Sequence, residues 1–151
     1  DRRIYGLGFL RNIYYHRMLI IVLNIMEREG VKVLKRRARE FLEAALDDIE
    51  KKRFDLAAFH SEQAVQLALK YVLARDAGYY PRTHSIRRLL FEATKLHAMM
   101  KDLYERYKYL LELMEEAYIS ARYLPRTWSP EVVRDMVEAA REILRELGAW
   151  S

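Results

Sequence analysis

The sequence of 151 residues has no cysteine, and it is poor in glycine, with five residues, and in proline, with three. The absence of cysteine excludes a disulfide framework, a zinc site built on thiolates and a cysteine nucleophile. Few glycines and prolines argue against an all-β sandwich, which needs a turn about every 8–12 residues. The longest apolar stretch, Met18–Met26, contains Asn24 and is far shorter than the ~20 residues of a membrane-spanning helix. No small-residue cleavage site follows it, so we expect a cytoplasmic, soluble and mostly helical single domain.

Charged and amide residues are distributed unevenly. The net charge is +5, and residues 1–40 carry ten basic and four acidic side chains, whereas residues 41–151 carry 17 and 18. The main basic cluster comprises Lys32, Lys35, Arg36, Arg37 and Arg39. Such a cluster fits nucleic acid or an acidic partner, or it is a solvated helix face. Asparagine and glutamine together number only four, a scarcity of heat-labile residues that favours a heat-adapted source.

The first 25 residues differ from the rest of the chain. They mix aromatic and β-branched residues with two glycines and show no clean period, whereas Met26 opens a charged, helix-favouring stretch. We therefore expect an N-terminal extension of uncertain origin over residues 1–25 and a helical bundle over residues 26–151. Two interpretations of the extension stay open: it packs on the bundle or on a neighbouring subunit, or it is upstream sequence that the core fold does not need.

From about residue 31 the apolar residues recur at helical spacing. The first face comprises Leu34, Ala38, Phe41, Leu42, Ala45, Leu46 and Ile49. The second helix, expected over about 54–77, is apolar over much of its circumference, which is typical of a helix at the centre of a bundle. Gly78 supplies a stop for this helix, and Pro81 keeps the chain from re-entering helix.

Three more helices follow. Thr83 or Ser85 can cap the third helix, whose expected inward residues are Ile86, Leu89, Leu90, Ala93 and Leu96. Its boundary with the fourth is poorly marked, and the inward stripe of the fourth comprises Leu103, Tyr107, Leu110, Met114, Ala117 and Ala121, before Pro125. The run Ser129-Pro130-Glu131 begins the fifth helix, whose expected inward residues are Val133, Val137, Ala140, Leu144 and Leu147. The predicted fold class is therefore all-α, an up-and-down antiparallel helical bundle of about five helices.

Familiar catalytic motifs are absent from the sequence. It has no phosphate-cradling glycine loop, no GxSxG elbow and no HExxH. The four histidines are not paired at helical spacing, so no metal site is expected. The acidic pairs Asp47-Asp48 and Glu115-Glu116 consist of adjacent residues, which point in different directions on a helix, and we expect them to be solvated.

Three local features remain as candidate sites. The first is the segment that starts at Phe59-His60-Ser61 and continues to Lys70, and the second is His84 before the third helix. For both histidines the alternative is a structural role, packed against a neighbouring helix or bonded to a loop. The third feature is the pair Tyr118 and Arg122, which share a helix face at i,i+4. Arg122 either satisfies free carbonyls at the helix end or presents its guanidinium to a phosphate.

The three features occur in a characteristic order: A-x-F-H-S-E-Q-A-x-x-L-A-L-K, then Y-P-R-T-H-S-I-x-x-L-L, then A-Y-I-x-A-R-Y-x-P. This ordered set resembles the HEPN family (higher eukaryotes and prokaryotes nucleotide-binding) over roughly residues 33–147. The resemblance implies a helical bundle, usually a homodimer, often encoded beside a minimal nucleotidyltransferase as a toxin–antitoxin pair. The chain is also similar to the helical domain attached to some antibiotic nucleotidyltransferases.

The ribonuclease members of the family carry an arginine separated by four to six residues from a histidine. Arg122 matches the arginine, but the histidine positions hold Thr127, Trp128 and Ser129, and Tyr123 replaces a small polar residue. Proton transfer to and from RNA needs a group that titrates near neutral pH, which this motif lacks. The departure therefore favours binding over cleavage, and we assign no catalytic residue.

We accordingly expect a module that binds a nucleotide or polynucleotide, without a cofactor or metal, as a homodimer and as the partner of a minimal nucleotidyltransferase. The candidate ligand-binding residues are Tyr118, Arg122, His60, Lys70 and His84. One alternative is a metal-independent endoribonuclease toxin, in which His60 or His84 replaces the missing histidine. A second alternative is a purely structural dimerisation module. No membrane association is expected.

Overall fold

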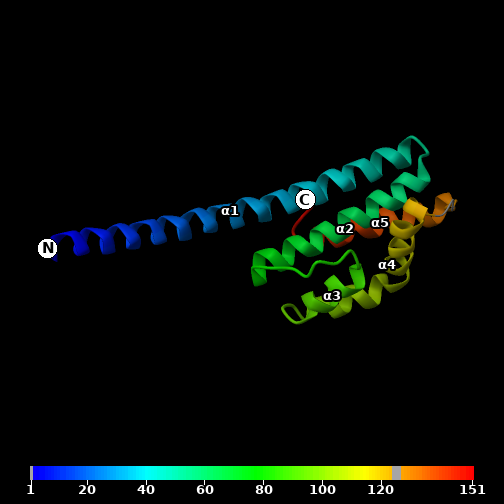
Figure 1. Ribbon diagram of the computed structural model, residues 1–151. Helices are drawn as coiled ribbons and strands as arrows, with labels where there is room; N and C mark the ends of the chain where they lie inside the picture. Colours follow the sequence, from blue (N-terminus) through cyan, green and yellow to red (C-terminus); the bar gives the residue numbers. More distant parts are fainter. Residues whose placement is uncertain (1, 124–126) are drawn as a thin grey trace.

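The computed structural model describes residues 2–123 and 127–151, and the regular structure in this part of the chain is entirely helical (Figure 1). The five helices are α1 (Arg2–Glu50), α2 (Phe54–Ala77), α3 (Ile86–Thr94), α4 (Met99–Tyr123) and α5 (Pro130–Glu146). The predicted all-α bundle is therefore confirmed.

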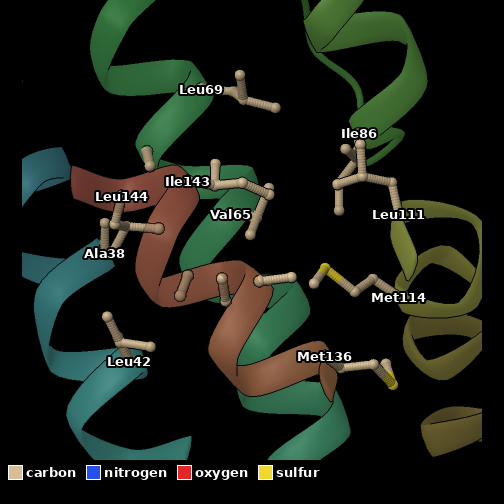
Figure 2. Packing of buried hydrophobic residues seen from close by; sticks show 14 of the residues in the cluster. Ala38, Leu42, Val65, Leu69, Ile86, Leu111, Met114, Met136, Ile143 and Leu144 are labelled. Carbon is tan, nitrogen blue, oxygen red and sulfur yellow. The ribbon is translucent and has the colours of Figure 1, made fainter. Parts of the chain in front are cut away.

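Helix α2 lies at the centre of the bundle, where it contacts each of the other four helices. It can do so because small side chains (Ala57, Ala58, Ala64 and Ala68) are fully buried on it and let its neighbours approach closely. Figure 2 shows the core around it, with Leu42 from α1, Leu69 from α2 and Met114 from α4 pointing into the shared interior. The central position predicted from the nearly all-round apolar surface of this helix is confirmed.

The helix boundaries follow the local chemistry of the sequence. Ser85 is the N-cap of α3, its Oγ accepting from the Arg88 amide at 3.2 Å, while Thr83 Oγ1 accepts from the Ser85 amide. Gly78 ends α2 in the left-handed conformation, at φ 80°. Ser129 caps α5 in the same way as Ser85 caps α3. Between the two candidate caps of the third helix, the structure therefore selects Ser85.

Two expected core positions are wrong. Leu96 is 40% exposed, because α3 ends at Thr94 and leaves Leu96 in the short connection to α4. Ala121 is exposed in the last turn of α4. Pro125, expected to end the fourth helix, lies outside the described residues. The expected inward residues of α5, by contrast, are all buried (Val133, Val137, Ala140, Leu144 and Leu147).

The N-terminal part of α1 is a continuous helix that extends beyond the bundle (Figure 1). We call residues 2–30 the arm. The helical period in the sequence starts near residue 31, and the helix itself starts earlier, at Arg2; Val31 is where α1 packs against the hydrophobic core. Of the arm side chains that the structure describes, all but Ile13 are exposed, which fits the lack of a clean apolar period in this stretch. None of the described helices combines the length and apolarity needed to span a membrane.

Candidate ligand-binding site

One face of α2 carries polar side chains into the interior. Glu62, Gln66 and Lys70 are spaced four residues apart and so lie on one side of the helix. Glu62 is fully buried and Gln66 is nearly so. The Gln66 amide joins the other two, because its Nε2 donates to Glu62 Oε1 at 2.7 Å and its Oε1 accepts from Lys70 Nζ at 3.1 Å. The result is a hydrogen-bonded row that runs from a buried acid to a half-buried cation.

The surroundings of this row shift the pKa values of Glu62 and Lys70. Burial raises the pKa of Glu62 to about 7, against the opposing effect of the hydrogen bonds from Gln66 and Gln63, and the nearby Glu115 carboxylate raises it further. Burial also lowers the pKa of Lys70, an effect that Glu62 opposes. Glu62 therefore exchanges its proton near neutral pH, where an ordinary glutamate is fully ionised.

His84 joins this row from the loop between α2 and α3. The Gln66 amide reaches it twice: Nε2 donates to the His84 carbonyl at 3.3 Å, and Oε1 lies 3.2 Å from His84 Nδ1. Because an amide oxygen can only accept, Nδ1 carries the hydrogen of that bond. In the neutral ring, Nε2 is then the atom left to accept a proton or a hydrogen bond.

Tyr118 on α4 lies between two other rings. Its ring is 5.4 Å from that of His84 and 6.5 Å from that of Phe59, with interplanar angles of 26° and 18°. A cavity of about 190 Å³ opens beside His84 and Tyr118, and Ser85, Glu115 and Ile119 complete its lining. The arrangement offers flat aromatic surface next to hydrogen-bonding groups, which suits a planar, partly polar ligand.

The carboxylate of Glu115 has a structural task at this cavity. Its Oε1 accepts from Ser85 Oγ and from the Arg87 amide, both at 2.8 Å, which places a negative charge at the N-terminus of α3. The expectation that Glu115 is simply solvated is therefore wrong. This contact fixes the start of α3, and with it the loop that carries His84, against α4.

The second half of the Tyr118–Arg122 pair is only partly described. Arg122 lies in the last turn of α4, one turn beyond Tyr118, and its side chain lies outside the described residues. Among the positions where a ribonuclease histidine would fall, Thr127 is exposed, Trp128 is buried and Ser129 caps α5. Trp128 also donates its amide to Asp55 Oδ1 at 3.3 Å. Two of these three positions thus serve the fold.

His60 belongs to a different environment on the α1 side of α2. Its Nδ1 pairs with Asp48 Oδ2, and its ring lies 5.8 Å from those of Phe41 and Phe59. Asp48 is 3% exposed and also pairs with Arg53 Nε at 3.2 Å. The expectation that Asp48 is solvated is wrong, because the chain turns back after α1 and covers it with α2. His60 therefore joins two helices, whereas His84 and Lys70 share the Gln66 network.

Sequence reasoning missed Glu62, Gln66 and Phe59 as candidates. A signal for the first two was present, since a glutamate and a glutamine lie four residues apart on a helix that is apolar over much of its circumference. A polar pair at such positions indicates a buried hydrogen-bonded network. Within the described part of the chain, no group of three or more histidine and acidic side chains is placed to hold a metal ion.

A protein-family model for the HEPN domain matches residues 31–150. A search of curated proteins finds no significant match to the chain. The matched range starts at Val31, where α1 begins to pack against the bundle, so it covers the bundle and leaves out the arm.

Proposed function

This chain belongs to the HEPN domain family, and from that premise we propose that it binds a nucleotide or polynucleotide at the cavity beside Tyr118. HEPN domains are helical modules of the nucleotide-binding and ribonuclease type. The proposal assigns the base to the aromatic surface of Tyr118 and His84, and the phosphate to Lys70 and Arg122.

The convergence of three separate segments on Tyr118 carries this proposal. Phe59 from α2, His84 from the loop before α3 and Tyr118 from α4 stack their rings, although 25 and 34 residues separate them along the chain. Base–aromatic stacking accepts any base, because every base has a π-face. Lys70 lies next to the stack through Gln66, and Arg122 follows Tyr118 by one helical turn. Ammonium and guanidinium groups are the usual partners of phosphate.

Isothermal titration calorimetry with ATP, GTP and a short single-stranded RNA tests the ligand site. In this assignment Arg122→Ala removes a charge-assisted hydrogen bond to the ligand phosphate, and we expect the affinity for the ligand to fall about tenfold or more. Arg145→Ala is the matched control, since it removes an equal charge from the exposed face of α5, outside the basic cluster of α1. Unchanged binding in Arg122→Ala, with the fold intact by circular dichroism, would contradict the assignment. If Arg122→Ala unfolds the chain instead, the arginine is a helix cap and the assignment also fails.

A metal-independent endoribonuclease is the second candidate function. One observation favours it: His84 stacks on Tyr118, so an imidazole lies one turn from Arg122 along α4. In that reaction a base takes the proton of the ribose 2′-hydroxyl, the oxygen attacks phosphorus, and an acid protonates the leaving 5′-oxygen. The HEPN arginine–histidine motif lacks its histidine here, so we favour binding without cleavage. Incubation of labelled RNA with the protein in the absence of metal distinguishes the two functions. Cleavage by the wild type that both His84→Ala and Arg122→Ala abolish would establish the ribonuclease.

We also propose two protein partners, a second copy of this chain and a minimal nucleotidyltransferase. HEPN domains often dimerise, and we propose a cytoplasmic homodimer that pairs with a minimal nucleotidyltransferase in a toxin–antitoxin system. A purely structural dimerisation module is the remaining alternative, and nucleotide binding in calorimetry would contradict it. The neighbouring gene tests the pairing: an adjacent nucleotidyltransferase supports it, and the absence of one argues against it.

A further inference from the structure

We propose that Tyr80 and Lys70 form a second subsite beside the ligand cavity, where the Tyr80 ring stacks on a base. With this subsite, the protein takes two successive nucleotides of a single-stranded nucleic acid. The inference rests on the function proposed above and narrows its ligand from any nucleotide to a strand with at least one phosphodiester. It also adds a residue, Tyr80, to the ligand-binding set.

Tyr80 and His84 belong to one loop, which runs from the end of α2 to the start of α3 (Figure 1). The sequence of the loop sets its conformation. Gly78 turns the chain at φ 80°, and Tyr80 precedes Pro81, which restricts it to extended backbone. The Thr83 amide then donates to the Pro81 carbonyl at 2.9 Å. The loop therefore holds the two rings in a defined arrangement.

Lys70 links the two rings from the side of α2. Its Nζ lies 5.6 Å from the centre of the Tyr80 ring and donates to Gln66 Oε1 at 3.1 Å. The same oxygen lies 3.2 Å from His84 Nδ1, so the Tyr80 ring centre is within about 12 Å of that atom. Two successive bases of a splayed strand can reach both rings. In this series of contacts the ammonium group lies between two rings, as a phosphate lies between two bases.

The positive charge of the subsite is available to a ligand. Within the part of the chain that the structure describes, Lys70 has no carboxylate at ion-pair distance. Arg82, which is exposed on the loop between the two rings, has none either. Phosphodiester oxygens accept hydrogen bonds from ammonium and guanidinium groups. The subsite therefore favours a ligand whose phosphate lies between its bases.

The alternative is that Tyr80 only holds the loop against α2. A second cation–π contact on α2 shows how a structural ring is placed: Tyr71 contacts Lys35 and Arg75, and it is 8% exposed. Tyr80 contacts a cation as well but is 37% exposed. The Tyr80 ring thus keeps open surface on which a base can stack, and base–aromatic stacking tolerates any base.

Two ligands that differ in one base test the subsite. Adenylyl-(3′→5′)-adenosine and the same dinucleotide with one base removed carry equal charge and the same sugars. Calorimetry at low salt, where phosphate contacts are strongest, should show the full dinucleotide binding the wild type about tenfold more tightly. We expect the same ratio with deoxyribose, because the subsites contact bases and phosphate. Equal affinities of the two ligands, with either sugar, would overturn the proposal.

Substitution of Tyr80 locates the second base. Tyr80→Ala should bind the full dinucleotide no better than the abasic one, whereas Tyr80→Phe, which keeps the ring, should retain the tenfold ratio. Tyr80→Leu gives the same test if the alanine variant does not fold. Tyr109→Ala is the matched control, because Tyr109 is exposed and lies nine residues from Tyr118, on the opposite face of α4. A ratio that survives Tyr80→Ala or Tyr80→Leu, or that Tyr109→Ala also removes, would overturn the assignment.

AMP separates this inference from the proposed function. It has a single base, which the stack of His84 and Tyr118 accommodates, so we expect AMP to bind the wild type and Tyr80→Ala equally. If AMP binds but a second base adds no affinity, the Tyr80 subsite is wrong and the ligand site beside Tyr118 stands. If neither AMP nor the dinucleotide binds the wild type, both proposals are wrong.

Discussion

His60 and His84 lie at the two ends of a row of rings that runs through Phe59 and Tyr118, and their surroundings differ in kind. His60 pairs with a buried carboxylate, Asp48, which also holds Arg53, and its ring packs between Phe41 and Phe59. His84 is exposed, bonds to the neutral amide of Gln66 and lies beside a cavity. One histidine is fixed by a charge between two helices, and the other is oriented by an amide at an opening. We infer that the His60 side stabilises the fold and the His84 side binds the ligand.

The largest expected effect comes from Glu62, the buried acid on the His84 side: it makes the free energy of unfolding depend on pH. The folded-state pKa of Glu62, about 7, lies above its ordinary value of 4.5. The stabilising contribution of protonated Glu62 to the free energy of unfolding is therefore fully present below pH 4.5 and is lost as pH rises through 7. A shift of this size changes the free energy of unfolding by about 3 kcal/mol over that window. Glu62→Gln should remove the change, as measured by urea unfolding at pH 4.5 and 7.5.

Glu105→Gln on the exposed face of α4 is the control for this measurement. We expect the stability difference between this variant and the wild type to vary little over the same window. If the stability difference between Glu62→Gln and the wild type also varies little with pH, the pKa of Glu62 is not raised by burial. The proposed electrostatic difference between the surroundings of His60 and His84 would then be wrong.

The next effect belongs to the His60 side. Asp48→Ala removes the buried acceptor of both His60 and Arg53, and we expect the free energy of unfolding to fall by about 2 kcal/mol. The adjacent Asp47→Ala is a matched control, because Asp47 is exposed and pairs only with the exposed Lys51 and Arg53. That change should cost under about 1 kcal/mol. Equal losses in the two variants would show that the His60 contact does not stabilise the fold.

The smallest predicted effect concerns the cap that holds the His84 loop. Ser85→Ala removes the acceptor for the Arg88 amide and the hydroxyl that donates to Glu115. The expected loss is about 1 kcal/mol, typical of an N-cap serine. Thermal unfolding measures the loss, and Ser85→Thr, which keeps the hydroxyl, should recover most of it. If Ser85→Thr is as unstable as Ser85→Ala, the hydrogen bonds of this cap are not what hold the loop.

The sequence predicted those parts of the fold whose causes are local. Ser129 and Gly78 mark helix ends through their own chemistry, and the apolar circumference of α2 indicates its central place. The helix over the arm was not predicted, because an apolar period arises where one face of a helix is buried, and all the described side chains of the arm except Ile13 are exposed. The burial of Asp48 depends on the return of the chain at 51–53, and the stacking of His84 on Tyr118 depends on the packing of α3 on α4. Such long-range contacts leave no spacing in the sequence.

The most direct test of this account compares His60→Ala with His84→Ala in the binding of single-stranded RNA and nucleotides, measured by calorimetry on folded protein. We expect His84→Ala to lose affinity about tenfold, because its stacking surface is lost. We expect His60→Ala to keep its affinity and to lose stability instead. Lost affinity in His60→Ala with unchanged affinity in His84→Ala would contradict the account.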